Sequence, residues 1–129
     1  MASTGPMIVV LRPRRESFDQ KLWKMLVADE VAQSKATEIV GLDFDPILNT
    51  QDPSPKYLVN RVSMRGGHCN PVVVAVSHGV QGEDVMPELI RSNGRWIFVN
   101  FHYRSEDNGK VEDTDLLQML NELKEERSK

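Results

Sequence analysis

Residues 92–103, SNGRWIFVNFHY, decide the fold more than any other stretch of the chain. Asn93 and Gly94 predict a two-residue type I′ turn, because that turn needs positive φ at both positions and these residues tolerate it. The residues after the turn alternate large side chains. Period-two geometry places on one face Trp96, Phe98, Asn100 and His102, and on the other Ile97, Val99, Phe101 and Tyr103. Because both faces are largely apolar, the sequence predicts a hairpin whose second strand is central and buried on both sides.

Turn signals before this hairpin predict further strands. The candidate strands span residues 56–65, 71–78, 84–92 and 95–103. The connections between them, GGHCN, GVQGE and NG, are short and contain the glycine and asparagine that hairpins require. The sequence therefore predicts an antiparallel meander of four strands.

Helices are expected on both sides of the strands. Ser17 and Gln20 form a capping-box pattern at the start of an amphipathic helix that runs to about residue 38. Asp113 or Thr114 is expected to cap a final helix. The apolar face of that helix is expected to consist of Leu116, Leu117, Leu120 and Leu123. Strands flanked by helices, without βαβ alternation, predict an α+β domain whose helices pack on one face of a curved sheet.

Length and composition fit one folded domain. The chain has 129 residues, of which 40% are hydrophobic and 27% charged, close to the averages of globular proteins. Residues 1–16 lack helical periodicity and contain Gly5, Pro6 and Pro13, so we expect a poorly defined N-terminal segment there. We expect residues 17–129 to form the single domain.

Charge and hydropathy argue against two classes of partner. The net charge is −3, from 16 Lys and Arg against 19 Asp and Glu, and no basic stripe is interleaved with aromatic residues as in nucleic-acid binders. The longest apolar runs, such as residues 7–11 and 71–76, are far shorter than the roughly 20 residues of a membrane span. We therefore expect neither nucleic acid nor a membrane as a partner.

Asn100 and His102, at the end of the last predicted strand, are the first candidates for a site. If they project into a cavity, the imidazole of His102 and a carboxylate such as Asp45 can act as an acid–base pair. Trp96 and Phe98 share their expected face and are the accompanying ligand-binding candidates. In the structural alternative, Asn100 bonds a neighbouring backbone group and His102 lies at a wet strand end. The sequence favours this alternative, because no acidic residue lies within three positions of His102 in the sequence.

Three other groups of polar residues are interpreted as structural. They are His68, Cys69 and His78; the carboxylates Asp43, Asp45 and Asp52; and the cations Arg12, Arg14 and Arg15. The first group is too small for a zinc site, and the second lacks the glycine turn and the ligand number of a calcium loop. The third is interpreted as a solvated cluster. Cys69 is the only cysteine, which excludes an intrachain disulfide, and we expect no metal and no cofactor.

Four segments together resemble an uncharacterised bacterial family. They are FDPILNTQDPSPKY (residues 44–57), PVVVAV (71–76), NGRWIFVNFHY (93–103) and DLLQMLNEL (115–123). That domain-of-unknown-function family is placed in the nuclear-transport-factor-2-like, or cystatin-like, superfamily of conical α+β folds. The resemblance covers about residues 17–123 and implies a bent sheet wrapped round helices, with a cavity between its concave face and the helices. It carries over no catalytic residues.

The expected function is a non-enzymatic binding or protein-interaction domain that acts through the conical cavity or an exposed sheet face. Its expected partners are a second copy of the chain or another protein at the sheet face, as in immunity or inhibitor proteins, or a small molecule in the cavity. No nucleophile elbow, phosphate loop or metal motif is present. The alternative is a small cofactor-free enzyme, similar to isomerases or hydratases, that uses His102 with an acidic partner in the cone.

The N-terminal residues bear on the compartment of the protein. The charges of residues 1–15 follow the short apolar run, which is the reverse of the order in a secretion signal, so no signal peptide is expected in the chain as given. Members of the resembled family often begin with an export signal and with a further helix. We therefore expect a periplasmic or secreted protein if the N-terminus is truncated, and a cytoplasmic one otherwise.

Overall fold

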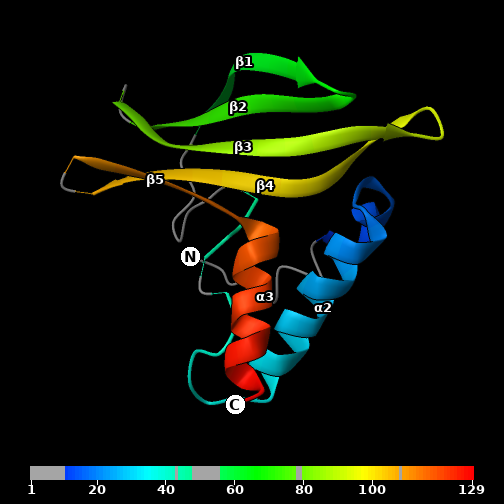
Figure 1. Ribbon diagram of the computed structural model, residues 1–129, viewed down its shortest axis with the longest axis vertical. Helices are drawn as coiled ribbons and strands as arrows, with labels where there is room; N and C mark the ends of the chain where they lie inside the picture. Colours follow the sequence, from blue (N-terminus) through cyan, green and yellow to red (C-terminus); the bar gives the residue numbers. More distant parts are fainter. Residues whose placement is uncertain (1–10, 43, 48–55, 78–79, 108) are drawn as a thin grey trace.

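The computed structural model describes residues 11–42, 44–47, 56–77, 80–107 and 109–129, and it shows an α+β domain (Figure 1). In chain order the helices are the 3-10 helix η1 (Arg12–Ser17), α2 (Gln20–Ser34) and α3 (Leu116–Arg127). The strands are β1 (Lys56–Arg65), β2 (His68–Ser77), β3 (Val80–Ser92), β4 (Arg95–Asp107) and β5 (Lys110–Asp115). Each strand pairs antiparallel with the next, so the sheet order is β1-β2-β3-β4-β5.

The fifth strand corrects the predicted four-stranded sheet. Its sequence, KVEDTD, has no apolar alternation, which is why its pattern gave no strand signal. Pairing with β4 nevertheless extends over all six residues, from His102 opposite Asp115 to Asp107 opposite Lys110. As a result β4 lies inside the sheet, between β3 and β5, and β5 forms one edge.

The predicted hairpin at Asn93-Gly94 is present, with Ser92 opposite Arg95 and with positive φ at both turn residues, 51° and 77°. The predicted alternation after it is wrong, because β4 contains a bulge. Glu88 pairs with Asn100 and Leu89 pairs with Phe98, so Val99 is an extra residue that shifts the alternation.

The bulge brings two aromatic residues to the same face of β4. The rings of Phe98 and Phe101 stack with their centroids 5.2 Å apart, although the simple period-two pattern assigned them to opposite faces. Phe18 lies 5.4 Å from the Phe98 ring on the same side. This cluster of rings connects the N-terminal part of the chain to the middle of the sheet.

The first long helix begins later than the capping-box pattern predicts. Phe18 has extended backbone angles and forms a bridge with Phe98, and the N–H of Asp19 donates to the carbonyl of Phe98 at 2.7 Å. These contacts end η1 at Ser17, so the cap of α2 is Asp19, whose carboxylate accepts from the N–H of Lys21. The helix ends at Ser34 rather than near residue 38.

The last helix is also capped by a different residue from the two predicted. Asp113 and Thr114 belong to β5, and the carboxylate of Asp115 accepts from the N–H of Gln118 at 2.9 Å. The helices pack mainly against β4 and β5, whereas β1 and β2 lie farther from them (Figure 1). The buried core between helices and sheet consists of Phe18, Leu22, Leu26, Val85, Phe101, Tyr103, Leu116 and Leu120.

A buried ion pair connects α2, the following loop and the C-terminal end of α3. Asp29 accepts from the guanidinium of Arg127 at 3.0 Å and from the N–H of Leu42 at 2.9 Å, and Arg127 also donates to the carbonyl of Val40. Gly41 passes so close to this pair that a Cβ there would lie 2.8 Å from the Asp29 carboxylate. The segment from Val40 to Leu42 is therefore fixed by the two helices. No helix in the described ranges is both long and apolar enough to cross a membrane.

Candidate functional site

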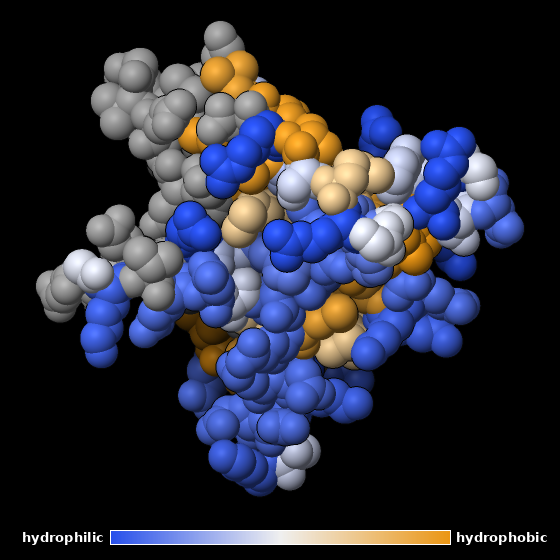
Figure 2. Space-filling model, turned by 45° about the horizontal axis from the view of Figure 1, so that its top comes forward, coloured by the Kyte–Doolittle hydropathy of each residue, from blue (hydrophilic) through white to orange (hydrophobic). Residues whose placement is uncertain are grey.

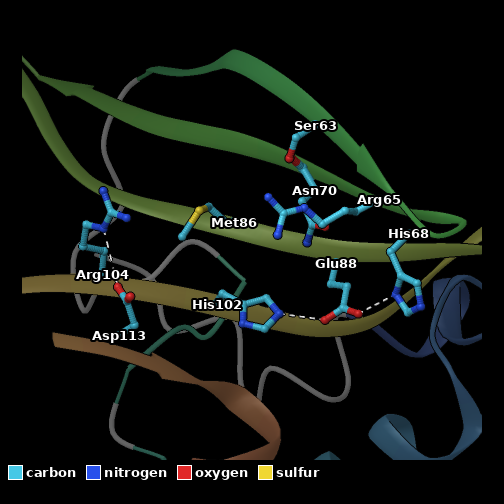
Figure 3. Close-up of a pocket in the computed structure, with 9 residues that line it drawn as sticks. All are labelled: Ser63, Arg65, His68, Asn70, Met86, Glu88, His102, Arg104 and Asp113. Carbon is cyan, nitrogen blue, oxygen red and sulfur yellow. Dashed lines mark hydrogen bonds and ion pairs between the residues drawn. The ribbon is translucent and has the colours of Figure 1, made fainter.

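An open hollow of 690 Å³ lies on the face of the sheet opposite to the helices (Figure 3). Along β3 and β4 the buried residues Val85 and Phe101 point to the helices, so their neighbours Met86 and His102 point to the other side. The hollow, called here the sheet hollow, is lined by Ser63, Arg65, His68, Asn70, Met86, Glu88, His102, Arg104 and Asp113. All five strands thus contribute residues to one surface.

The most organised part of the sheet hollow is a carboxylate held between two imidazoles. Oε2 of Glu88 lies 2.6 Å from Nδ1 of His68, and Oε1 lies 2.7 Å from Nε2 of His102. The three residues come from β2, β3 and β4, and antiparallel register brings them together across 14 and 20 residues of sequence. The Glu88 side chain is 21% exposed, so the carboxylate is partly shielded from solvent.

The two imidazoles determine the charge of Glu88. Partial burial by itself raises the pKa of the Glu88 carboxyl, but hydrogen bonds and positive charge from His102 and His68 outweigh it and hold the pKa below its usual value. Glu88 is therefore an ionised acceptor at neutral pH. An ionised carboxylate cannot donate, so each ring must carry a proton on the nitrogen that faces Glu88.

This arrangement fixes what each imidazole presents to a ligand. With Nδ1 of His68 and Nε2 of His102 directed to Glu88, the opposite ring nitrogens make no hydrogen bond to any described residue. In a neutral ring the opposite nitrogen is an acceptor, and in a protonated ring it is a donor. The sheet hollow can therefore exchange hydrogen-bonding roles, or a proton, with a bound molecule.

The remaining charges of the sheet hollow are unevenly matched. Nε of Arg104 is 3.5 Å from Oδ1 of Asp113, a long contact between two exposed side chains. Arg65 has no ion pair with any residue that the structure describes. In Figure 3 its side chain reaches from β1 toward the middle of the hollow, close to Asn70, while Arg104 and Asp113 lie at the other end. Arg65 is thus the unmatched cation of the lining.

Of the residues that the sequence singled out in the last strand, His102 alone lines the sheet hollow. Its acidic partner is Glu88 and not Asp45, whose carboxylate accepts from the N–H of Ile47 beside the core residue Tyr103. Burial, together with Asp45 and Asp115, raises the pKa of the Tyr103 phenol far above its usual value. Asp45 therefore belongs to the surroundings of the core and not to the hollow.

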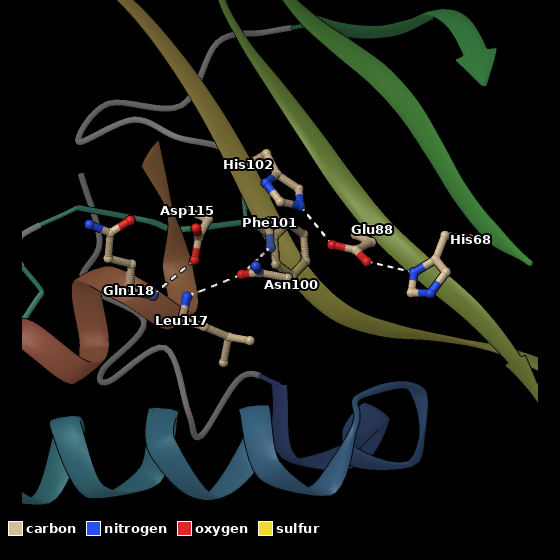
Figure 4. Close-up of polar contacts among 8 residues, drawn as sticks. All are labelled: His68, Glu88, Asn100, Phe101, His102, Asp115, Leu117 and Gln118. Carbon is tan, nitrogen blue, oxygen red and sulfur yellow. Dashed lines mark hydrogen bonds and ion pairs between the residues drawn. The ribbon is translucent and has the colours of Figure 1, made fainter. Parts of the chain in front are cut away.

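The other three candidates of that strand lie outside the hollow. Phe98 packs against the core, and Trp96 is partly exposed with the guanidinium of Arg91 over its ring. Asn100 is buried, and its side-chain oxygen accepts from the N–H of Phe101 at 2.9 Å and of Leu117 at 3.1 Å (Figure 4). Asn100 thus caps α3 together with Asp115, which joins the helix start to β4.

The three further polar groups of the sequence are also separated. His68 bonds Glu88 rather than Cys69, whose thiol is free and partly buried. His78, Asp43 and Asp52 lie outside the described residues. The side chains of Arg12, Arg14 and Arg15 are exposed along η1. No group of three or more His, Cys, Asp or Glu within the described ranges is arranged to hold a metal ion.

Sequence reasoning missed Glu88 and Arg65. Both lie in strands that were predicted, and Glu88 is the one acid inside the apolar run MPELI. That unusual position was a usable signal, because an acid inside a buried strand requires a partner. The identity of the partners depends on the register between strands, which the sequence does not state.

No protein-family model, curated protein or solved structure matches this chain.

Proposed function

We propose that this protein is a non-enzymatic binding domain that holds a small carboxylate-bearing molecule in the sheet hollow. The observation that carries the proposal is the unmatched charge of Arg65 in a lining whose described acids are already engaged. Glu88 is bonded by two imidazoles, and Asp113 is close to Arg104. A ligand with a negative charge would therefore provide the missing partner of Arg65.

The chemistry of Arg65 suits a carboxylate. A guanidinium presents its N–H groups in a planar fork that matches two carboxylate oxygens, and such paired bonds add direction as well as energy. Asn70 lies beside Arg65, and His68 and His102 line the same hollow. These groups can bond polar substituents of the same ligand.

The size of the sheet hollow fits this class of ligand. Its volume of 690 Å³ lies inside the range of about 300–1,000 Å³ that is typical of small-molecule sites. Met86 supplies an apolar contact between the charged groups. A small organic acid meets both features.

Calorimetric titration with matched probes tests the proposal. Benzoate is expected to bind and benzamide, which has the same shape without the charge, is not. Arg65→Gln should weaken benzoate binding at least about tenfold, since removing a charged hydrogen-bond partner typically costs more than 1.4 kcal/mol. Arg61→Gln is the matched control, because Arg61 lies on the same strand outside the hollow. Equal affinity for the two probes, or equal losses in the two variants, refutes the proposal.

A second candidate is an acid–base enzyme, and the 2.7 Å contact between His102 and Glu88 favours it. In this candidate Nδ1 of His102 takes a proton from a carbon next to a carbonyl group, and Glu88 stabilises the resulting imidazolium. Pyruvate in D2O then exchanges its methyl protons faster with the protein than without it, as proton NMR measures. His102→Gln should abolish the acceleration and His68→Gln should retain it. Exchange at the rate of buffer alone removes this candidate.

The fold assignment implied by the resemblance is also part of the proposal. Support for a cystatin-like cone comes from the element order, in which a long helix precedes an antiparallel sheet and a C-terminal helix follows it. One feature differs from the expectation. The sheet hollow lies on the face away from the helices, whereas the resemblance implies a cavity between sheet and helices.

A further inference from the structure

Strand β1 forms an exposed edge of the sheet with an unusual composition. No described strand pairs with its outer side, because the sheet order begins at β1. Four of its apolar side chains are exposed, with fractions of 44% for Leu58, 62% for Val59, 56% for Val62 and 59% for Met64. Figure 2 shows hydrophobic surface, flanked by hydrophilic side chains, in the upper part of the molecule where the outer strands lie. An exposed apolar edge is a template for pairing with another strand.

The opposite edge of the sheet lacks this property. Strand β5 is short and carries Glu112, Asp113 and Asp115, and its last residue leads directly into α3. Charged side chains and short length are the devices by which proteins protect an edge against pairing. The contrast identifies β1 as the edge that is open to a partner.

The side chains of β1 sort by chemistry onto two faces. From residue 61 onward the strand alternates, so Arg61, Ser63 and Arg65 share one face while Val62 and Met64 share the other. One face of this half-strand is therefore basic and the other apolar. A strand laid beside it would need acidic side chains on one face and apolar side chains on the other.

We propose that the outer edge of β1 binds an extended segment of another protein in which acidic and apolar residues alternate. The backbone groups of β1 supply the pairing, and Arg61 and Val62 select the side chains of the segment. This proposal does not depend on the sheet hollow, because neither Arg61 nor Val62 lines it.

Charge argues against a second copy of β1 as the occupant. The strand KYLVNRVSMR contains three cations and no acid, although the whole chain has a net charge of −3. Pairing of two such strands would place the cations of one copy beside those of the other, and like charges on neighbouring strands are destabilising. An acidic segment removes this repulsion.

Titration of the full chain with a designed peptide tests the proposal. The probe is a short peptide of alternating glutamate and valine, and its counterpart has lysine in place of glutamate. The glutamate peptide is expected to bind and to slow hydrogen exchange at backbone amides of β1 but not of β5. The lysine peptide is expected not to bind, because its charges oppose that of Arg61.

Variants of β1 identify the contacts. Arg61→Glu should lower the affinity for the glutamate peptide at least about tenfold and allow the lysine peptide to bind, since charge reversal turns an attraction into a repulsion. Val62→Asn should also lower the affinity for the glutamate peptide. Lys124→Glu is the matched control, because it makes the same charge change on the exposed side of α3 and should leave binding unchanged.

Two results would overturn the proposal. One is the absence of binding by the glutamate peptide, or binding that Arg61→Glu and Lys124→Glu reduce equally. The other is a dimer of the chain in analytical ultracentrifugation that Val62→Asn dissociates, which would assign the edge to a second copy. Failure of benzoate to bind bears on the sheet hollow only and leaves these outcomes unaffected.

Discussion

The two faces of the sheet are built from neighbouring residues of the same strands and serve different purposes. On the helix side, Phe101 and Val85 are buried in an apolar core. On the open side, one residue further along each strand, His102 and Met86 line the sheet hollow. Because alternate residues belong to different faces, substitutions in one face should change stability and substitutions in the other should change binding. Substitutions at neighbouring residues of one strand can therefore test whether stability and binding depend on different faces.

The largest effect is expected for Phe101→Ala. The side chain is fully buried, with 0% exposed, and its ring stacks on Phe98 at the centre of the core. Removing such a ring leaves a cavity that the surrounding structure fills only partly, so the free energy of unfolding should fall by about 3–5 kcal/mol. Urea denaturation followed by circular dichroism measures the loss.

Met86→Ala is the control for the open face. Met86 lies in the hollow and is partly exposed, so its truncation should cost less than about 1.5 kcal/mol. If Phe101→Ala and Met86→Ala lowered the free energy of unfolding equally, both faces of the sheet would contribute equally to stability. That result would contradict the distinction between the two faces.

The fold was predictable where local chemistry decides it. The Asn93-Gly94 turn requires positive φ at both positions, and the structure has it there. The bulge at Val99 was not predictable from the local pattern, because the extra residue in β4 is evident only from the pairing of β4 with β3. Strand β5 was missed for a related reason, since its polar residues gain strand structure from their pairing with β4.

The site was predictable only in part, for the same physical reason. His102 was chosen because an imidazole at the end of an apolar strand is unusual, and it does line the sheet hollow. The position of Glu88 beside His102 depends on the register between β3 and β4. Asp45 was predicted to be the acidic partner of His102, but it lies near Ile47 and Tyr103, and the sequence does not give that position. Asn100 was considered with His102, yet the bulge and the start of α3 bring its side chain to Leu117.

A smaller loss is expected for Tyr103→Phe, on the helix side. The buried phenol donates to the carbonyl of Pro46 at 2.7 Å, so its removal leaves a buried acceptor unpaired and should cost about 1–3 kcal/mol. Burial first, and then the charges of Asp45 and Asp115, raise the pKa of Tyr103 above the ordinary value of 10.0. The native state therefore favours the protonated phenol.

The sign of the pH dependence follows from that raised pKa. The contribution of Tyr103 is complete below pH 10.0, and it decreases at higher pH because the unfolded chain ionises while the native phenol stays protonated. Urea denaturation from neutral to alkaline pH should show a stability difference between wild type and Tyr103→Phe that narrows above pH 10.0. A difference that stays constant or widens there contradicts the buried position of the phenol.

The smallest effect on stability is expected on the open face, for Glu88→Gln. Because the contacts of Glu88 with His68 and His102 are partly exposed, the loss at neutral pH should be about 1 kcal/mol or less. Burial alone would raise the Glu88 pKa, but the two imidazoles hold it below 4.5 in the native state. Its contribution is therefore complete above pH 4.5 and is lost as the pH falls through the lower native pKa. Urea denaturation should show that the difference in the free energy of unfolding between wild type and Glu88→Gln disappears in that acid range. A difference that does not change with pH would show that the imidazoles do not stabilise the carboxylate.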